Sequence, residues 1–317
     1  MAKDRVIALS GGVGGAKLAL GLSRVLPPHA LTVVANTGDD FEHLGLSISP
    51  DLDTLLYTLA GLDNPSTGWG QRDESWSFMA ALEALGGETW FRLGDRDLAT
   101  HVERTRRLRA GESLSAIMDD FAGRLGIGAR ILPMSDDRVR TKVKTAAGWL
   151  DFQDYFVRRQ CRPAISAVAF DGAESARPHP EFLSALADPQ LRAIVICPSN
   201  PLISIEPILA LPGIRAALRA ARAPVIAIAP IIGGAAVKGP TAKMMRELGT
   251  APSASAVAQR YGDLLDAYVV DHRDAADCRG LDLDIVPTKA LMESLADRET
   301  LARIVLETAD RIMAPVA

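Results

Sequence analysis

Short, continuous apolar runs alternate along this chain with stretches of helical periodicity, and this alternation limits the possible folds most narrowly. The runs are rich in β-branched residues and bounded by turn residues, and they occupy residues 6–9, 31–34, 165–170, 193–197, 225–229 and 268–270. Strands that are apolar along their whole length are buried on both faces, which requires helices on both sides of a mainly parallel sheet. The pattern therefore predicts a doubly wound α/β fold.

One region interrupts the alternation. Residues 62–128 contain no convincing strand, whereas residues 75–85, 97–110 and 114–125 have helical patterns, the last preceded by Ser113 as an N-cap. We therefore expect two parts: residues 1–61 and 129–317 form the α/β core, and residues 62–128 form a helical insertion beside it.

Composition excludes several classes of protein. The chain has 317 residues and a net charge of −4, with no basic run longer than residues 104–107, so a dedicated nucleic-acid surface is not expected. The longest uncharged stretch, residues 223–237, contains prolines and glycines and is shorter than the roughly 20 apolar residues of a membrane helix. The N-terminus lacks the apolar region of a signal peptide. Cys161, Cys197 and Cys278 are odd in number and widely spaced, which favours reduced thiols and a cytoplasmic location.

A glycine-rich segment directly after the first strand is the clearest candidate for phosphate binding. Gly12, Gly14, Gly15 and Lys17 precede an apolar helix that is expected from about Leu18. Glycines allow backbone N–H groups to approach an anion, and a helix N-terminus adds unpaired donors. The spacing fits neither the dinucleotide G-x-G-x-x-G pattern nor a Walker A motif. The alternative is a tight turn without a ligand.

Four carboxylates follow the second strand. Asp39 and Asp40 come first, and Asp51 and Asp53 lie at the start of the next expected helix. Mg²⁺ is commonly held by one or two carboxylates together with substrate phosphates, so these acids suit a metal beside the glycine segment. The second pair also fits an ordinary helix start, with Ser49 as N-cap and acids in the first turn.

Other polar loops follow later strands. Ser199 and Asn200 follow one strand and Gly233 lies after another, so both loops are expected at the rim of the crevice, where they suit a nucleotide or simply turn the chain. The segment 272–274, His-Arg-Asp, has the first letters of a kinase catalytic loop but lacks the rest of that pattern. We interpret it as a surface turn.

Taken in order, several segments of this chain resemble the CofD family, the 2-phospho-L-lactate transferases of coenzyme F-420 biosynthesis, and the bacterial branch in particular. The segments that carry the resemblance are residues 11–16, 38–40, 50–54, 68–74, 93–101, 135–138, 152–154, 198–201 and 230–233. Such an ordered series is much more specific than a single glycine-rich loop.

The resemblance implies a Rossmann-like core, a homodimer and a Mg²⁺-dependent reaction. A guanosine diphospho-carboxylate donor would transfer its phospho-carboxylate to the deazaflavin alcohol Fo and release GMP. The acid of the donor, whether lactate, enolpyruvate or glycerate, stays open.

The resemblance also implies roles for individual residues. Asp53 and Arg92 would contact Fo, and Asp39 and Asp53 would bind Mg²⁺. The guanosine diphosphate would be held by Gly12, Gly14, Gly15, Lys17, Ser199, Asn200 and Gly233. Asp53 is also the expected catalytic residue, which would orient or deprotonate the attacking hydroxyl.

Two other functions compete with this interpretation. A regulatory protein of the gluconeogenesis-factor group, which binds UDP-sugars, would share the glycine segment and the crevice. The segments at 68–74, 93–101 and 152–154 favour the transferase, because they resemble its acceptor side. A nicotinamide oxidoreductase would need a glycine where Lys17 stands.

Overall fold

A seven-stranded parallel sheet forms the centre of the molecule in the computed structural model, which describes residues 4–314. Its strand order is β14-β13-β10-β9-β1-β2-β5, and every neighbouring pair is parallel. The strands are β1 (Arg5–Ser10), β2 (Leu31–Ala35), β5 (Arg130–Pro133), β9 (Leu191–Ile196), β10 (Val225–Ile228), β13 (Ala267–Asp271) and β14 (Asp284–Thr288). The predicted doubly wound α/β fold is confirmed.

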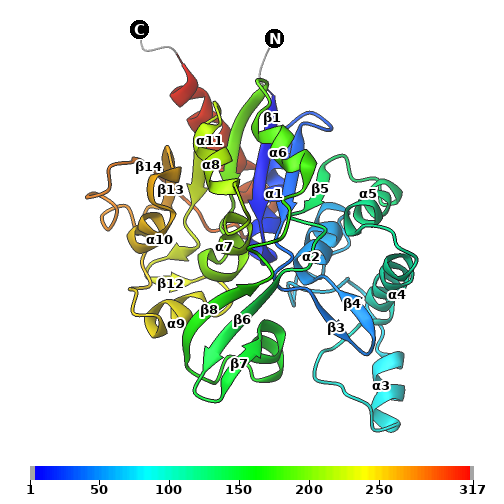
Figure 1. Cartoon of the computed structure of the whole chain (residues 1–317). Coiled ribbons are helices and arrows are strands. Elements are labelled where there is room, and N and C mark those ends of the chain that lie inside the picture. Colours follow the sequence, from blue (N-terminus) through cyan, green and yellow to red (C-terminus); the bar gives the residue numbers. More distant parts are fainter. Residues whose placement is uncertain (1–3, 315–317) are drawn as a thin grey trace.

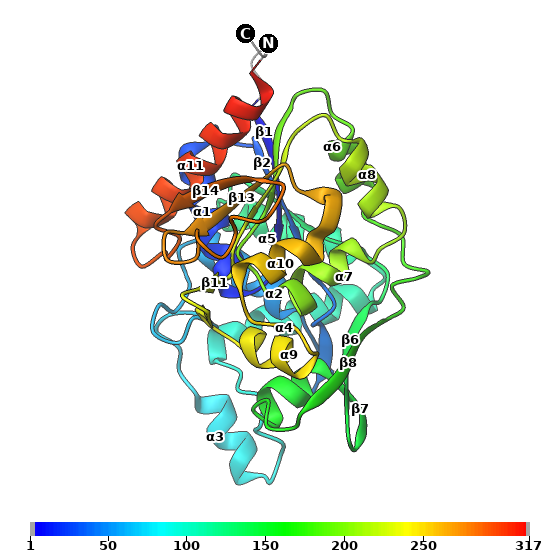
Figure 2. The same ribbon diagram turned by 90° about the vertical axis from the view of Figure 1, so that its left-hand side faces the viewer.

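Helices cover both faces of this sheet, and Figure 2 shows α1 and α11 on one side with α6 and α8 on the other. The helices of the first side are α1 (Gly12–Val25), α2 (Pro50–Leu59), α5 (Leu114–Arg124) and α11 (Leu295–Met313). Those of the second side are α6 (Pro180–Leu186), η2 (Pro201–Ile205), α7 (Glu206–Leu209), α8 (Ile214–Ala220), α9 (Thr241–Glu247), α10 (Ala254–Tyr261) and η3 (Gly262–Leu264). No single helix within residues 4–314 is long and apolar enough to cross a membrane, although η2, α7 and α8 together have that length and composition with a bend of 81°.

The side chains of the central strands alternate between two apolar cores. In β1, Ile7 and Leu9 enter the core beneath α6, whereas Val6 and Ala8 enter the core beneath α1 and α11. β9 repeats the alternation with Ile194 and Val195. Burial on both faces is the physical reason that these strands are apolar along their whole length.

A second sheet, antiparallel and three-stranded, lies below the carboxyl ends of the central strands (Figure 1). It consists of β6 (Arg140–Thr145), β7 (Gly148–Asp151) and β8 (Ile165–Asp171), and it leads into the short π-helical turn η1 (Asp154–Arg158). The run 165–170 is therefore a strand, as predicted, but it belongs to this small sheet and not to the parallel one. Two further hairpins pair β3 (Phe41–His43) with β4 (Leu46–Ile48), and β11 (Ile231–Ile232) with β12 (Ala235–Ala236).

The region 62–128 is helical, with α3 (Ser77–Ala84), α4 (Asp95–Arg109) and α5. Ser113 caps α5 as expected, since its hydroxyl accepts the Ala116 N–H at 3.2 Å. α4 packs on β4 and α5 packs on β5, so both are docked on the core, while α3 projects from the lower right of Figure 1. The division into two domains stays a prediction.

Candidate active site

A cavity of about 710 Å³ lies at the carboxyl ends of the central strands. Its lining comes from the segments that follow β1, β2, β9 and β10, with Gly12, Asp39, Ser199 and Pro230 as one representative of each. Ligands of open α/β sheets bind at this end of the strands. The small antiparallel sheet and the insertion complete the walls through Phe152 and Trp69, among others.

The glycine-rich segment is the first turn of α1 and not a loop that precedes the helix. α1 begins at Gly12, so the expected start near Leu18 is wrong by more than a turn. The Gly12 N–H donates to Asp51 Oδ1 at 2.7 Å, and the Gly11 N–H donates to Ser199 Oγ at 3.1 Å. The first N–H groups of a helix have no partner within it. Val13 and Gly14 belong to this first turn and line the cavity, so their N–H groups are placed to bind an anion.

Lysines add positive charge on this side of the cavity. Lys17 and Lys238 both line it. Lys17 Nζ donates to the Met292 carbonyl at 3.0 Å, and burial, with Arg298 and Lys238 nearby, lowers the pKa of the Lys17 ammonium. Cations that repel one another in this way are stabilised when a phosphate binds between them.

Asp39 and Asp51 form an acidic wall of the same cavity. Both carboxylates are buried and line the cavity. Burial raises the pKa of Asp51 to about 6. Burial and then the neighbouring Asp51 charge raise the pKa of Asp39 well above its ordinary value. Asp51 Oδ2 accepts from the Asn36 side chain at 2.9 Å, whereas Asp39 Oδ1 has no hydrogen-bond partner within the described chain.

This wall fits a divalent cation. A buried carboxylate oxygen without a partner and a second carboxylate beside it are destabilising unless a positive charge lies between them. Across residues 4–314 no group of three or more His, Cys, Asp or Glu side chains is arranged as a complete metal site. Two carboxylates are nevertheless what Mg²⁺ commonly takes from a protein when substrate phosphates supply further ligands.

Asp53 has different surroundings from Asp39. It is buried and is not among the residues that line the cavity. Its Oδ2 accepts from Arg104 Nη1 at 3.1 Å, and its Oδ1 accepts from Arg104 Nη2. Ser49 occupies the N-cap position of the same helix, as expected. Its hydroxyl donates to Asp40 Oδ2 at 2.8 Å and does not cap the helix. The metal and catalytic roles expected for Asp53 stay predictions.

The loop after β9 contributes the other polar side chains. Ser199 Oγ accepts the Gly11 N–H, and Asn200 Oδ1 accepts the Leu202 N–H at 2.9 Å. The Asn200 Nδ2 amide is buried without a hydrogen-bond partner in the described chain, which leaves a donor available to a ligand.

Two of the predicted nucleotide-binding glycines, Gly15 and Gly233, are outside the lining of the cavity. A Cβ on Gly15 would lie 2.3 Å from Ser10 Oγ, so this glycine permits close packing. The Gly233 N–H donates to Asp274 Oδ2 at 2.8 Å, which links that glycine to the turn at 272–274. Neither residue lines the cavity.

The remaining wall is aromatic. Trp69, Trp90, Phe91, Phe152 and Phe156 all line it. The rings of Phe152 and Phe156 are stacked, with centroids 5.4 Å apart. Arg92 also lines the cavity, and its guanidinium lies 4.2 Å from the ring centroid of Trp76. This wall suits a flat, conjugated ligand.

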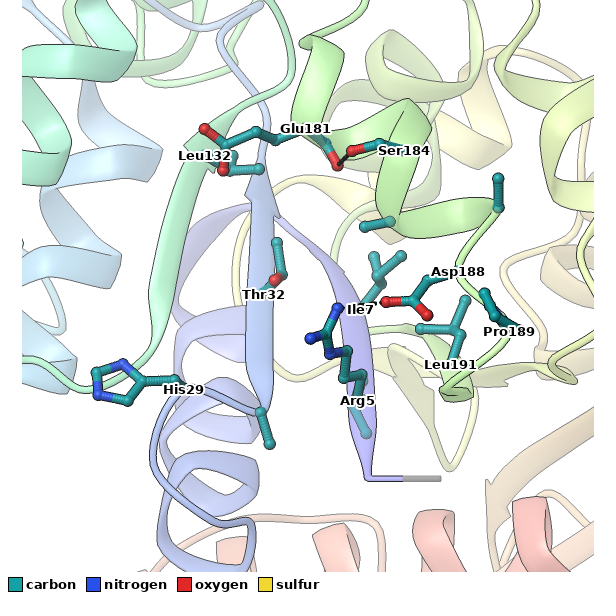
Figure 3. A pocket seen from close by; sticks show the side chains of 14 residues that line it. Arg5, Ile7, His29, Thr32, Leu132, Glu181, Ser184, Asp188, Pro189 and Leu191 are labelled. Carbon is teal, nitrogen blue, oxygen red and sulfur yellow. Dashed lines mark hydrogen bonds and ion pairs between the residues drawn. The ribbon is translucent and has the colours of Figure 1, made fainter. Parts of the chain in front are cut away.

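A second cavity, of about 500 Å³, lies at the opposite, amino ends of β1, β2 and β9 (Figure 3). Its charged side chains pair within the protein: Arg5 bonds to Asp188, and Glu181 accepts from Arg130 at 2.7 Å. None of the predicted site residues lines it. The chemistry therefore belongs to the first cavity.

Comparison with known proteins identifies the family. The model of "2-phospho-L-lactate transferase CofD" matches residues 6–292. The chain belongs to the CofD family. It is 42% identical to a phosphoenolpyruvate transferase of Kitasatospora aureofaciens, over 97% of this chain and 98% of that protein. It is 44% identical to a phosphoenolpyruvate transferase of Thermobifida fusca, over 86% and 87% of the two chains.

Among solved structures, a UPF0052-family protein of Bacillus halodurans has the same fold. Its TM-score is 0.66 at 15% identity, with 96% of this chain and 99% of that chain covered. The family and its relatives establish this CofD protein as a transferase, with an α/β fold that the structural neighbour shares.

Two acidic residues in the family segments of this CofD protein, Glu74 and Asp95, hold the insertion together and do not line the cavity. The Glu74 carboxylate accepts the Arg96 and Asp97 N–H groups at 2.8 and 2.9 Å, and so caps α4. Asp95 accepts the Ser77 and Phe78 N–H groups, both at 3.0 Å, at the start of α3. These reciprocal caps explain why acids recur in the segments 68–74 and 93–101.

The sequence prediction for this CofD protein missed Arg104, which bonds Asp53, and two aromatic residues that line the cavity, Phe91 and Phe156. Arg104 was considered only as part of a short basic run, and its i, i+3 spacing from His101 gave the only sign of a shared buried face. The aromatic residues lie far apart in sequence, so only the fold brings them to one wall.

Proposed function

We propose that this CofD family transferase moves a phosphoenolpyruvyl group from a guanosine diphospho-donor to the deazaflavin alcohol Fo, with release of GMP, in coenzyme F-420 biosynthesis. The observation that carries the proposal is the division of one cavity into three walls. One wall has helix N–H groups and lysines, one is acidic with a carboxylate oxygen that has no partner in the described chain, and one is aromatic. Both relatives described above are phosphoenolpyruvate transferases, which favours enolpyruvate among the three candidate acids.

The donor diphosphate fits between the first turn of α1 and the acidic wall. The N–H groups of Val13 and Gly14 and the ammonium groups of Lys17 and Lys238 would bind its oxygens, with Asn200 offering a further donor. Asp39 and Asp51 would hold Mg²⁺. When bound, Mg²⁺ offsets the negative charge of the diphosphate beside these carboxylates.

Fo fits the aromatic wall, where a deazaflavin ring would stack on Trp or Phe side chains and Arg92 would contact its polar edge. Its terminal hydroxyl oxygen then attacks the phosphorus that bears the enolpyruvyl group. A new P–O bond forms, the bridging P–O bond breaks with its electron pair leaving on GMP, and the hydroxyl proton passes to solvent water.

The chain accelerates such a step mainly by placement and charge. Phosphoryl transfer needs little covalent help from a protein. The Val13 and Gly14 amides are fixed by the helix, and Lys17 is held by the Met292 carbonyl, so these donors face the developing charge without reorganisation. The aromatic wall would hold the hydroxyl in line with the phosphorus.

Thermal-shift titration tests this function against its rival. GDP with Mg²⁺ at about 100 times its Kd should add about 2.7 kcal/mol of stability, which corresponds to a rise of about 5 °C in Tm. Fo should add a further rise, and chelation of Mg²⁺ should reduce the rise due to GDP. Stabilisation by UDP-sugars alone would instead support a regulatory protein of the gluconeogenesis-factor group.

A further inference from the structure

A buried ionic cluster joins α4 of the insertion to α2 of the core, just behind the acidic wall. Arg104 on α4 is completely buried, and its guanidinium bonds both oxygens of Asp53 on α2. Arg104 Nη1 also donates to the Ser47 carbonyl at 3.3 Å. An arginine whose fork spans a carboxylate in this way is fixed in geometry as well as in charge.

Further bonds hold this cluster in place. His101 Nε2 lies 3.2 Å from Asp97 Oδ1, and the Tyr57 hydroxyl donates to the same oxygen at 2.6 Å. His101 Nδ1 lies 3.7 Å from Asp53 Oδ2. Asp53 and Tyr57 lie on α2, whereas the other members lie on α4, so the two helices are locked at a defined spacing.

Arg104 compensates only part of the acidic charge nearby. Asp53 has this guanidinium as a direct partner, and the Arg140 and Arg104 charges oppose the effect of burial on the pKa of Asp40. Among the described residues, Asp51 accepts its hydrogen bonds from neutral groups, the Asn36 side chain and the Gly12 amide. Asp39 Oδ1 has no partner in the described chain. Asp39 and Asp51, which line the cavity, therefore have no ion-pair partner within residues 4–314, whereas Asp53 has Arg104.

We propose that Arg104 is the internal counter-ion that holds Asp53 away from the divalent cation and leaves Asp39 and Asp51 to bind it. This inference rests on the proposed function, because it concerns the same metal. It makes Arg104 a positioning residue supplied by the insertion. It also replaces the expected metal and catalytic roles of Asp53 with a structural one, since Asp53 acts by fixing the helix that presents Asp51.

Mn²⁺ binding, followed by electron paramagnetic resonance in the presence of GDP, separates these roles without an activity assay. Wild-type protein should bind one strongly held Mn²⁺ per chain. Asp39→Asn should weaken Mn²⁺ binding by at least about 100-fold, the upper range for outer-shell partners of a metal. Asp53→Asn should leave the affinity within about threefold of the wild type, as should the matched control Asp119→Asn, whose side chain pairs with Arg130 at the surface.

Arg104 itself gives the most specific signature. Arg104→Met leaves Asp53 without its cation, and we expect a second Mn²⁺ per chain, which the double variant Asp53→Leu/Arg104→Met should lack. Loss of a buried ion-pair partner destabilises a protein strongly, whereas replacement of both partners by apolar residues often does not. If Arg104→Met fails to fold, the double variant still tests the proposal. The Mn²⁺ affinity of the double variant should match that of the wild type.

The outcomes distinguish this inference from the proposed function. Loss of Mn²⁺ from Asp53→Asn or from the double variant, each with a cooperative thermal transition, would make Asp53 a ligand and overturn the inference. A folded Arg104→Met that binds a single Mn²⁺ would also contradict it. A wild-type protein that binds no Mn²⁺ with GDP would instead refute the metal assignment in the proposed function.

Discussion

Gly14 shows how a single residue shapes this site, because it lets the first turn of α1 touch the loop after β9. A Cβ at this position would lie 2.4 Å from the Pro198 carbonyl oxygen, a backbone atom that cannot move aside on its own. The glycine-rich pattern predicted a close approach of backbone to a phosphate. In the structure Gly14 lines the cavity, and its missing Cβ permits the contact of one backbone with another.

Gly14→Ala should therefore destabilise the protein by about 1–3 kcal/mol through overpacking, and should weaken GDP binding as the turn shifts. Gly123→Ala is the matched control. Gly123 lies in α5 with open space at its Cβ position, so alanine there should stabilise by about 0.4–1 kcal/mol. Urea denaturation measures both changes, and an equal effect of the two substitutions would refute the packing argument.

At the scale of elements, the insertion is held by caps and ion pairs more than by an apolar core of its own. α3 contributes one fully buried side chain, Met79, to the small cluster that also contains Ile48 and Leu93, and its Phe78 and Leu82 side chains are only partly buried there. The termini of α3 and α4 are instead fixed by Asp95 and Glu74. Sequence patterns predicted these helices to within a few residues because helical periodicity is local. They did not predict the capping partners, which lie about twenty residues away.

Glu74→Ala should remove two caps of α4 at once and cost about 1–2 kcal/mol. Glu83→Ala, an exposed change on α3, should stay within about 0.5 kcal/mol of the wild type. Hydrogen exchange of the Arg96 and Asp97 amides gives a local measurement. Faster exchange is expected at these amides in Glu74→Ala only, and unchanged exchange there would show that Glu74 does not cap the helix.

The small antiparallel sheet was also predictable in part. In β6, Thr141, Val143 and Thr145 are buried and alternate with charged residues, which is the pattern of a strand with one buried face. The prediction followed continuous apolar runs and so missed this strand. It then assigned residues 165–170 to the parallel sheet, because nothing local distinguishes the partner of a strand.

At the scale of the whole molecule, the buried acids make stability depend on pH. Burial raises the pKa of Asp40 to about 7 and that of Asp51 to about 6, so the folded protein holds more protons than the unfolded chain between about pH 4 and pH 7. Stability of the metal-free protein from these groups is therefore greatest below about pH 4, falls as pH rises, and becomes constant above about pH 7.

Comparison of the wild type with Asp40→Asn isolates this effect. The variant cannot gain this charge, and its amide oxygen can still accept from Ser49. The difference in Tm between the metal-free proteins should be small near pH 4 and should grow in favour of the variant up to about pH 7. A difference that is constant with pH would contradict the raised pKa of Asp40.

The whole account also depends on residues that meet only in three dimensions. The glycine-rich turn, the carboxylates and the Ser199 loop were predictable, because each follows a recognisable strand and parallel strands end at one edge of a sheet. Phe156 and Arg104 belong to segments with no such rule. Their roles followed only from the cavity and the buried contacts.

Mass spectrometry of the reaction products tests the central claim most directly. The protein would be incubated with Fo and the guanosine diphospho-donor of enolpyruvate, with Mg²⁺ or with excess chelator. The account predicts GMP and a phosphodiester of Fo that carries the enolpyruvyl group, both in the presence of Mg²⁺ and neither with chelator. Product formation that persists in full with chelator, or no phosphodiester of Fo from any of the three donors, would contradict it.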